Sequence, residues 1–441
     1  MNQSEYAAVF EDVCRMFYLQ RCGCAVDSSG AFSHPACHVT EARIYGTEEF
    51  KDVSGGWHDA GDYGRYIVPA AKAVADLLLA YSAAPSVFSD GLGIPESGNG
   101  VPDILDEVKY ELTWMKKMQR DDGGVYHKVT CGAFPGFILP HQETEELILS
   151  PVSTTATGDF AAAMAMAYPV FRVFDPAFAQ ECLHAAERAW EYLCITGCIP
   201  FVNPEGIVTG EYGDADDADE RYWAACALYA ATGGKAYHEY IKISYSPAWT
   251  ADLGWADVGA YGNAVYLGIS GEMTDGFLKG MITNGLLRTA DRLVELSHSN
   301  AYAVTAEKYI WGSNMTVLNN AMLLLMAHDI SPKETYISCA TRQLDYIFGN
   351  NPLSVCYVTG CAENSARHPH HRPSAAAGRA MPGMLVGGPD QYREDACACM
   401  HLAGADPDCC YIDDMESYST NEVAVYWNSP LIYVMARLML V

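Results

Sequence analysis

Two aspartates, Asp59 and Asp62, stand three residues apart in the stretch GGWHDAGDYGRY at positions 55–66. The stretch is otherwise rich in glycine and aromatic residues, and His58 directly precedes the first aspartate. Hydrolysis of a glycosidic bond requires two carboxyl groups, one that takes a proton from water and one that protonates the leaving oxygen. Because aspartate and glycine are also common in turns and metal loops, the residue types alone leave catalysis, a turn and a metal-binding loop open.

A second acidic segment, YIDDMESYSTNEVAVYWNSP, occupies positions 411–430 and contains Glu422. This glutamate lies between apolar neighbours and five residues before Trp427. A carboxyl group in such surroundings can keep its proton at neutral pH, as a general acid must. The serine, threonine and asparagine that precede it are also ordinary residues for the start of a helix, so both interpretations stay open.

A third segment, CYVTGCAENSARHPHHRP at 356–373, contains His370, His371 and Arg372. Histidine and arginine offer several hydrogen-bond donors in fixed geometry, which suits the recognition of sugar hydroxyl groups. A metal cluster and a solvated basic patch are the alternatives.

Thiol and imidazole groups recur near the start of the sequence, at Cys22, Cys37, His38 and His58. Four such ligands in a closed tetrahedral set form a structural zinc site. The spacing is wide, so buried cysteines and surface histidines explain the pattern as well. His34 competes for a histidine position.

Amphipathic helices must position these segments. Apolar residues recur at helical spacing, for example at Leu105, Val108, Leu112 and Met115. The pattern predicts few strands and many helices, at 4–20, 69–84, 103–119, 158–174, 178–195, 218–232, 235–243, 257–269, 275–297, 314–329, 333–348 and 420–439.

These helices predict one all-α domain over residues 1–441. A double-layered helical barrel is the closed arrangement in which every helix buries one face, and separate helical bundles are the alternative. In such a barrel the long loops gather at one end, where we expect the functional site.

The composition limits the classes of partner. The chain has 441 residues, of which 50% are hydrophobic and 19% charged, so it is long enough to bury a large core. Its formal net charge of −28 disfavours nucleic acids and anionic lipid surfaces as partners. No apolar run approaches the ~20 residues that a membrane span needs. A neutral small molecule or polysaccharide suits this chain better.

Sixteen cysteines are scattered along the chain rather than spaced as a disulfide framework. Five fall on predicted apolar helix faces and are expected to be reduced core thiols, which is typical of a reducing compartment: Cys14, Cys182, Cys194, Cys226 and Cys339. The first residues, MNQSEYAAVFEDVCRMF, are acidic and amphipathic and do not resemble a signal peptide. The expectation is a cytoplasmic protein, or a secreted one whose leader has been removed.

Together these segments resemble glycoside hydrolase family 9, the cellulase family with an (α/α)6 barrel. The resemblance runs from about residue 15 to the end of the sequence. It is carried by GGWHDAGDYGRY, DGGVYHKVT, LSPVSTTATGDFAAAMAMA, DYIFGNNP, VTGCAENSARHPHHR and YSTNEVAVYWNSP. The acidic segment fits the family pattern at Tyr411, Asp413, Tyr418, Glu422, Ala424, Asn428 and Ser429. In the histidine segment, Cys356 stands where Ser or Thr is usual and Ala362 where Gly is usual, which leaves the conformation of that loop open.

The resemblance implies a role for each carboxyl group. Asp62 would be the general base, Asp59 would position the attacking water, and Glu422 would be the general acid. The family inverts the anomeric centre, which implies about 6.5–9.5 Å between the carboxyl groups of Asp62 and Glu422.

The resemblance also implies the residues that hold the sugar. The subsites next to the cleaved bond would be lined by His370, Arg372, Asp413 and Tyr418, of which His370 and Asp413 are grouped with the catalytic residues. Sugar rings stack their apolar faces on aromatic side chains. The candidates for such contacts are Trp57, Tyr63, Trp311 and Trp427, with His127 as a hydrogen-bonding partner.

Two metals are implied as well. A subgroup of the family that normally carries an N-terminal Ig-like domain binds zinc through ligands arranged like Cys22, Cys37, His38 and His58, so a structural zinc is expected. The segment YGDADDADERYWAA at 212–225 matches a family calcium site, and its ligands would be Asp219, Glu220 and Asp257. Helix N-termini also favour Asp and Glu, and Ala215 and Asp216 stand where Ser and Gly are usual, so calcium is the weaker expectation. No organic cofactor is expected.

The resemblance thus predicts inverting, endo-acting hydrolysis of β-1,4-glucosidic bonds in cellulose-like or mixed-linkage glucans. One alternative is an exo-acting cellodextrinase or β-glucosidase that cleaves short cello-oligosaccharides. Another is a non-catalytic carbohydrate-binding barrel, against which the intact Asp59, Asp62 and Glu422 argue. The chain is expected to be a monomer without an Ig-like or carbohydrate-binding module, and a face left exposed by the missing module would favour a dimer.

Overall fold

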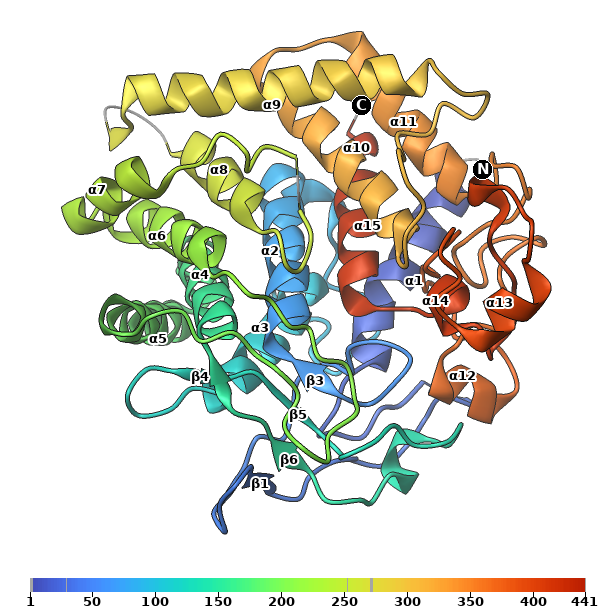
Figure 1. Cartoon of the computed structure of the whole chain (residues 1–441), viewed down its shortest axis with the longest axis horizontal. Helices are drawn as coiled ribbons and strands as arrows, with labels where there is room; N and C mark the ends of the chain where they lie inside the picture. Colours follow the sequence, from blue (N-terminus) through green and yellow to red (C-terminus); the bar gives the residue numbers. More distant parts are fainter. Residues whose placement is uncertain (1–2, 29, 252, 270–272, 441) are drawn as a thin grey trace.

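The computed structural model describes residues 3–28, 30–251, 253–269 and 273–440, with side chains from residue 6 onward. The chain is mainly helical, and its helices form two layers (Figure 1). The inner helices are α2 (Ile67–Ala83), α4 (Thr154–Phe171), α6 (Ala218–Thr232), α8 (Gly259–Gly268), α10 (Ser313–Ile330) and α15 (Val425–Leu438). The outer helices are α1 (Gln3–Leu19), α3 (Asp103–Lys117), α5 (Pro176–Ile195), α7 (Lys235–Ser244), α9 (Gly276–Ser297) and α11 (Glu334–Ile347).

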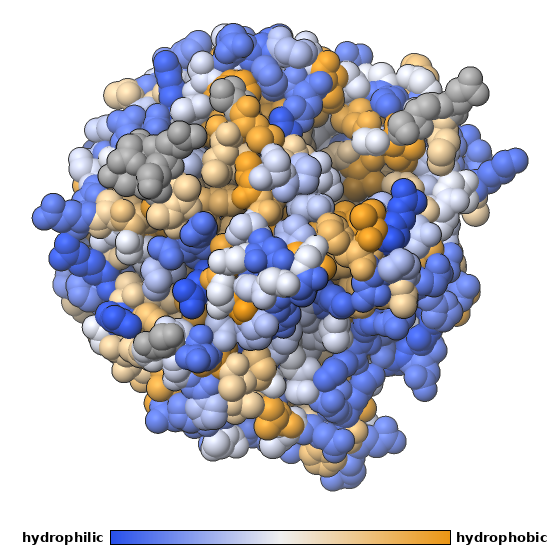
Figure 2. Space-filling model, turned by 180° about the vertical axis from the view of Figure 1, so that it is seen from behind, coloured by the Kyte–Doolittle hydropathy of each residue, from blue (hydrophilic) through white to orange (hydrophobic). Residues whose placement is uncertain are grey.

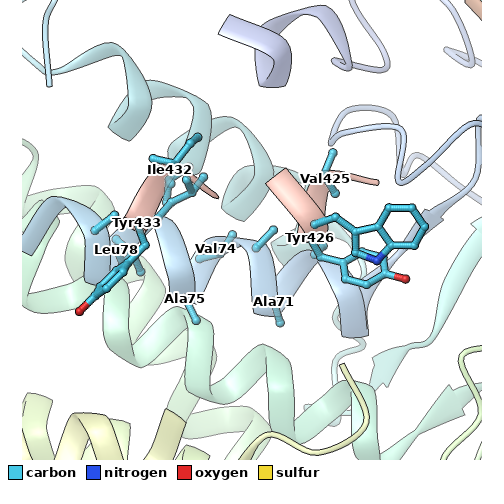
Figure 3. Close-up of a cluster of buried hydrophobic side chains, with 14 of the residues drawn as sticks. Ala71, Val74, Ala75, Leu78, Val425, Tyr426, Ile432 and Tyr433 are labelled. Atoms are coloured by element: carbon cyan, nitrogen blue, oxygen red, sulfur yellow. The ribbon is translucent and has the colours of Figure 1, made fainter. Parts of the chain in front are cut away.

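The inner helices pack against one another in a ring. Helix α15 contacts α2, α2 contacts α4, α4 contacts α6 and α6 contacts α8, while α10 packs against α15. Helices α2, α4 and α15 are buried over most of their circumference, which is typical of helices that other helices surround. Figure 3 shows the contact between α2 and α15, where Val74 and Leu78 lie close to Tyr426 and Ile432.

A buried polar network ties three inner helices together. Asp76 of α2 pairs with Lys72 at 2.7 Å, and both side chains are fully buried. The same carboxylate accepts hydrogen bonds from Ser429 of α15 at 2.7 Å and Tyr261 of α8 at 2.6 Å. Breaking a buried, fully satisfied network of this kind costs several kcal/mol, about 3–5 for an ion pair. The network therefore fixes how α2, α8 and α15 meet.

Short strands lie beside the barrel, at the lower end of the molecule in Figure 1. They are β1 (Ala42–Ile44), β2 (Phe50–Lys51), β3 (Arg65–Tyr66), β5 (Lys128–Thr130) and β6 (Ile148–Leu149), in the order β2-β1-β6-β5-β3. The pair β1–β6 is parallel and the other pairs are antiparallel. Strands β4 (Val125–Tyr126) and β7 (Val152–Ser153) form a separate antiparallel pair. Strand β3 directly follows residues 55–64 and pairs with β5, so the sheet holds the aspartate loop next to the segment that joins β5 to β6.

The predicted helices agree with the structure within a few residues, with one correction. The run predicted at 420–439 is interrupted: α14 (Tyr418–Asn421) ends before Glu422, which is extended at φ −69° and ψ 163°, and α15 begins at Val425. Short helices also occur at α12 (Arg372–Ala377) and α13 (Ala396–His401), and 3₁₀ turns at Pro85–Val87, Pro140–Gln142 and Pro407–Cys409. The break matters because it releases Glu422 from helical geometry.

Four of the five cysteines predicted to be core thiols are buried, whereas Cys194, on the outer helix α5, is exposed. All sixteen cysteines are free. Among the helices of the described residues, none combines the length and apolarity needed to cross a membrane.

Candidate active site

The two aspartates lie in a buried loop that the backbone holds from both sides. Asp59 and Asp62 are 3% and 5% exposed. The amide of Asp59 donates to the carbonyl of Gly64 at 3.0 Å, and the amide of Val425 donates to the carbonyl of Asp59 at 2.8 Å. The start of α15 is therefore attached to the aspartate loop by main-chain contacts.

Each aspartate accepts a hydrogen bond from a tyrosine that the sequence patterns did not single out. The hydroxyl of Tyr212 donates to Oδ2 of Asp59 at 2.6 Å, and that of Tyr66 donates to Oδ2 of Asp62 at 3.1 Å. The other oxygen of Asp59 is buried and has no partner among the described residues. Tyr66 lies four residues after Asp62 in the same motif, which is a usable signal, but nothing local marks Tyr212. An Asp59 oxygen without a partner is available for a water molecule.

Glu422 approaches this loop from the C-terminal segment. It forms an isolated parallel β-bridge with His370, and its carbonyl accepts from the amide of Gly387 at 2.8 Å. A Cβ atom built on Gly61 would lie 2.1 Å from the carbonyl oxygen of His370 and 3.3 Å from Oε1 of Glu422. Gly61 is thus the point of contact between the aspartate loop and the acid segment, and only glycine fits there.

Arg372 strengthens the same junction. Its backbone amide and its Nη1 both donate to the carbonyl of Gly61, at 3.1 and 2.9 Å, and its Nε donates to the carbonyl of Pro135 at 2.9 Å. The guanidinium group is close enough to favour the ionised forms of both Asp62 and Glu422. Arg372 therefore joins three segments that are distant in sequence.

Burial raises the pKa of all three carboxyl groups, and repulsion from the charge of Asp62 adds to it for Asp59 and Glu422. Desolvation is the largest cause for Glu422, whose pKa lies well above its ordinary value, and the charge of Asp62 adds to it. Desolvation also raises the pKa of Asp62, opposed by Arg372 and by the hydrogen bonds from Gly64 and Tyr66. The pKa of Asp59 lies well above its ordinary range because of desolvation and, second, the charge of Asp62. The arrangement suits an ionised aspartate next to a protonated glutamate.

Of the aromatic residues that were predicted to contact the sugar, two are exposed and three are buried. Trp311 and Tyr418 are 38% and 37% exposed, and their ring centroids are 5.2 Å apart. Trp57, Tyr63 and Trp427 are only 2–3% exposed. Rings buried to this extent offer little free face to a sugar, and the structure places these three in the packed core.

Those three buried rings have structural partners instead. Trp57 donates from its indole nitrogen to Glu107 at 3.1 Å and packs edge-on against Phe17. Trp427 underlies Gly312, where a Cβ atom would lie 2.9 Å from the indole. Tyr63 lies against His38 and His58, with ring centroids 5.8 and 4.9 Å away.

The polar candidates His127 and Asp413 have hydrogen-bond partners within the protein. His127 is fully buried, and its ring nitrogens contact Ser153 Oγ at 2.9 Å and the carbonyl of Glu211 at 3.0 Å, so neither is open to a sugar. Asp413 accepts from the amides of Arg367 and His368 at 2.9 and 2.8 Å, and thus holds the turn that leads to His370. His370 lies next to Tyr418, with ring centroids 5.9 Å apart, and its Nδ1 is 2.5 Å from the carbonyl of Met415.

The predicted thiol and imidazole ligands come together. The ligand atoms of Cys22, Cys37, His38 and His58 all lie within 4.8 Å of one another. Cys22 Sγ is 3.5 Å from His38 Nδ1, and Cys37 Sγ is 3.7 Å from His58 Nε2. Tetrahedral zinc with Zn–S near 2.3 Å and Zn–N near 2.1 Å places S and N about 3.6 Å apart, so the four side chains fit this metal. The competing His34 directs its Nδ1 to the carbonyl of Pro35 instead.

The predicted calcium ligands do not form a comparable set. In the described parts of the chain, the Cys/His cluster is the sole group of three or more ligand-type side chains with such spacing. Asp257 is exposed, and Oδ2 of Asp219 accepts from the amide of Val258 at 2.7 Å. Glu220 is fully buried, as is Asp159 of α4, and none of their four carboxylate oxygens has a partner among the described residues. The two helices approach closely here, because a Cβ atom on Gly158 would lie 2.6 Å from that of Glu220. Unpaired buried carboxylates of this kind are consistent with a cation.

Comparison with known sequences gives one family over nearly the whole chain. The model of Glycosyl hydrolase family 9 matches residues 6–435. A cellodextrinase of Butyrivibrio fibrisolvens is 37% identical over 467 residues, which cover 100% of this chain and 85% of that protein. Endoglucanase D of Acetivibrio thermocellus is 37% identical over 446 residues, which cover 98% of this chain and 69% of that protein.

Comparison with solved structures gives the same family. A single mutant (D468A) of a thermostable endoglucanase from Alicyclobacillus acidocaldarius superposes with a TM-score of 0.94 at 43% identity, covering 98% of this chain and 84% of that one. A Zn-binding triple mutant of the family 9 endoglucanase J30 superposes with a TM-score of 0.93 at 34% identity, covering 98% and 84%. The similarity confirms the predicted (α/α)6 barrel.

Proposed function

The chain belongs to glycosyl hydrolase family 9, and on that premise we propose that it cleaves β-1,4-glucosidic bonds in cellulose-like or mixed-linkage glucans. The observation that carries the proposal is the junction at Gly61. There the loop of Asp59 and Asp62 meets the segment of Glu422 so closely that no side chain fits between them. The contact brings the Glu422 carboxyl group close enough for the charge of Asp62 to raise its pKa, and glycosidic bond hydrolysis needs two carboxyl groups in one site.

In the proposed mechanism Asp62 takes a proton from the attacking water. Asp59 holds that water through its unpaired oxygen, while its other oxygen is occupied by Tyr212. Glu422 gives its proton to the leaving oxygen, and its raised pKa supports that role. Water attacks the face opposite to the leaving group, so the configuration at the anomeric carbon inverts, which requires about 6.5–9.5 Å between the two carboxyl groups.

The sugar is proposed to stack on the exposed pair Trp311 and Tyr418. His370 lies next to Tyr418 and on the segment bridged to Glu422, which supports a subsite adjacent to the cleaved bond. Arg372 orients the loop through the carbonyl of Gly61 and stabilises negative charge around Asp62 and Glu422.

We favour endo-acting cleavage, with an exo-acting cellodextrinase as the second candidate. The second candidate is supported by the relative named cellodextrinase, whose alignment covers the whole of this chain. Viscosity of a soluble cellulose derivative, followed together with the products from short cello-oligosaccharides, separates the two. A rapid fall in viscosity at low product yield supports endo cleavage, and an unchanged viscosity overturns it.

The proposal includes a structural zinc ion held by Cys22, Cys37, His38 and His58, because the S–N spacings match tetrahedral zinc. All four positions are filled by protein ligands, so the ion would stabilise the fold and supply no chemistry to the reaction. A calcium ion near Glu220 is the weaker part of the proposal, and the unpaired oxygens of Glu220 and Asp159 support it.

The general acid is tested by Glu422→Gln. The variant keeps the shape of the side chain but cannot donate the proton, so kcat on cellopentaose is expected to fall by about 10²–10⁴. Binding measured by calorimetry should persist. Glu416→Gln, at an exposed position six residues earlier, is the matched control and should keep full activity. Normal turnover by Glu422→Gln would overturn the mechanism.

A further inference from the structure

The segment between β5 and β6, residues 131–147, borders the candidate active site. Both of its ends are held in the sheet, where Val129 pairs with Leu149 and Thr130 with Ile148. It carries two phenylalanines toward the catalytic residues. The ring of Phe134 lies 5.4 Å from the Arg372 guanidinium, and the ring of Phe137 lies 5.5 Å from that of His370.

Phe137 is linked through His370 to the exposed pair Trp311 and Tyr418. The ring centroid of His370 lies 5.5 Å from that of Phe137 and 5.9 Å from that of Tyr418. Phe134 is 46% exposed, although it lies next to buried catalytic groups. An exposed apolar ring at this place is suited to the face of a sugar.

The middle of the segment is held by contacts with the candidate active site and with the Cys/His cluster. Arg372 donates to the carbonyl of Pro135 at 2.9 Å, and the hydroxyl of Tyr63 donates to the carbonyl of Ile138. Glu143 contacts His38 Nε2 at 2.8 Å through Oε2. The side chains of Glu143 and His38 are only 6% and 2% exposed, so this contact is shielded from solvent.

The donor and the acceptor in the contact between His38 and Glu143 can be assigned. The Nδ1 atom of His38 faces Cys22 and would be the atom that holds a metal ion, so the ring proton would lie on Nε2. That N–H would then donate to the Glu143 carboxylate. Carboxylates in this position orient a ligating histidine and strengthen metal binding.

We propose that Glu143 is a positioning residue that couples the Cys/His metal cluster to substrate affinity by holding the segment of Phe134 and Phe137 in place. The substrate part of this inference rests on the proposed function, and the metal part does not. Because Glu143 contacts neither the aspartate pair nor Glu422 in the hydrogen bonds of the structure, its loss should weaken binding and leave the chemical step nearly intact.

The test compares Glu143→Gln with Glu146→Gln in the full chain loaded with Zn²⁺. Glu146 is three residues away and pairs with Arg43 at 2.8 Å, but that pair is exposed, so it is a matched control. Zinc affinity is measured by competition with a chromophoric chelator. Glu143→Gln should lose about 10–100-fold in zinc affinity, and the control should change less than about twofold.

Substrate affinity is measured by calorimetry with cellopentaose in a Glu422→Gln background, so that the readout does not depend on turnover. Glu143→Gln should weaken binding by about tenfold, the size of one lost charge-assisted hydrogen bond. In the chain with Glu422 intact, KM should rise while kcat stays within about twofold. Phe134→Ala should weaken substrate binding without changing zinc affinity.

Zinc affinity equal to that of the control would overturn the link between Glu143 and His38. Weaker zinc binding with unchanged cellopentaose affinity would overturn the coupling. If Glu143→Gln does not fold, Glu143→Asp gives the same comparison with a shorter carboxylate, and an intermediate loss in both affinities supports the proposal. If no variant binds cellopentaose, the proposed function fails, whereas the zinc comparison still decides whether Glu143 supports the metal cluster.

Discussion

Tyr212 is the residue through which the catalytic loop contacts the long segment before α6. Besides donating to Asp59, it lies edge-on to Tyr66 and Trp255, with ring centroids 4.9 and 5.1 Å away. Its φ of 46° is left-handed, a conformation that costs about 1–3 kcal/mol in a non-glycine residue and is concentrated at functional sites. His38 of the Cys/His cluster shares this property, with φ 50°. The surrounding packing must hold both residues in these conformations.

The hydroxyl of Tyr212 is predicted to set the acid limb of the pH–rate profile. It favours the charged form of Asp59 and so lowers the pKa of that carboxyl group against desolvation. In Tyr212→Phe the pKa of Asp59 rises further, so Asp59, which in the proposed mechanism holds the water in its ionised form, becomes charged only at higher pH. The acid limb of kcat/KM should move up by about one pH unit, since a hydrogen bond to a charged group is worth about 1.5 kcal/mol.

In the proposed mechanism the alkaline limb of the same profile reports the loss of the proton of Glu422, and this limb should not move in Tyr212→Phe. Tyr45→Phe, which removes a hydroxyl exposed at the carbonyl of Glu205, serves as the control. Rates on cellopentaose measured across the pH range decide the prediction. An acid limb that stays in place would show that Tyr212 does not act on the aspartate pair.

At the scale of elements, the contact between α4 and α6 places Asp159 and Glu220 together, and no carboxylate oxygen of either has a hydrogen-bond partner among the described residues. Desolvation, then repulsion between the acids, raises both pKa values well above the ordinary range. The folded state therefore binds more protons than the unfolded state above about pH 4. Without a cation, the free energy of unfolding contributed by this pair falls as the pH rises from there.

Calcium binding should restore the stability that the Asp159–Glu220 pair loses as the pH rises. At neutral pH, added Ca²⁺ is expected to raise the unfolding temperature, and a concentration of about 100 Kd would add about 2.7 kcal/mol. Glu220→Gln should lose this response and should be more stable than the parent in chelator, because it removes a buried charge. Glu239→Gln, on the exposed face of α7, is the control. Calorimetry that finds no calcium response in the parent chain would remove calcium from the proposal.

The helices and the two carboxylate segments could be predicted because neighbouring residues carry their signal, as helical periodicity or as a short motif. The short strands were not, since two or three residues show no alternation. Whether an aromatic residue is buried is not local either: Trp57 and Trp311 are alike in the sequence, and only packing distinguishes them. Tyr212 was missed because its partner, Asp59, lies about 150 residues away. The break at Glu422 comes from its bridge to His370, which overrides the helical pattern around it.

At the scale of the whole molecule, the surplus of 55 acidic over 27 basic residues makes the surface strongly negative. Figure 2 shows hydrophilic residues over much of the face seen from behind, interrupted by hydrophobic patches. A charge of this size repels anionic polymers over the Debye length, which is about 30 Å at 0.01 M salt and about 10 Å at 0.1 M. An uncharged glucan chain does not experience this repulsion.

The rate on a glucan derivative should therefore depend on salt only if the derivative is charged. For carboxymethyl cellulose, KM should fall severalfold between about 0.01 and 0.1 M salt, because repulsion is screened. For uncharged hydroxyethyl cellulose it should change little. Initial rates on both polymers over this range measure the effect, and an equal response of the two would show that charge does not govern encounter with the substrate.

The attachment of α15 to the aspartate loop has a consequence for the synthesis of the protein on the ribosome. About 360 residues separate Asp62 from Glu422, and a ribosome that adds about 5–20 residues per second needs about 20–70 seconds to pass from one to the other. During that time the growing chain carries the proposed base without the acid, and the face of α2 that α15 will cover stays open. Until α15 has been translated, the nascent chain thus lacks the proposed acid and exposes the apolar face of α2 that α15 covers.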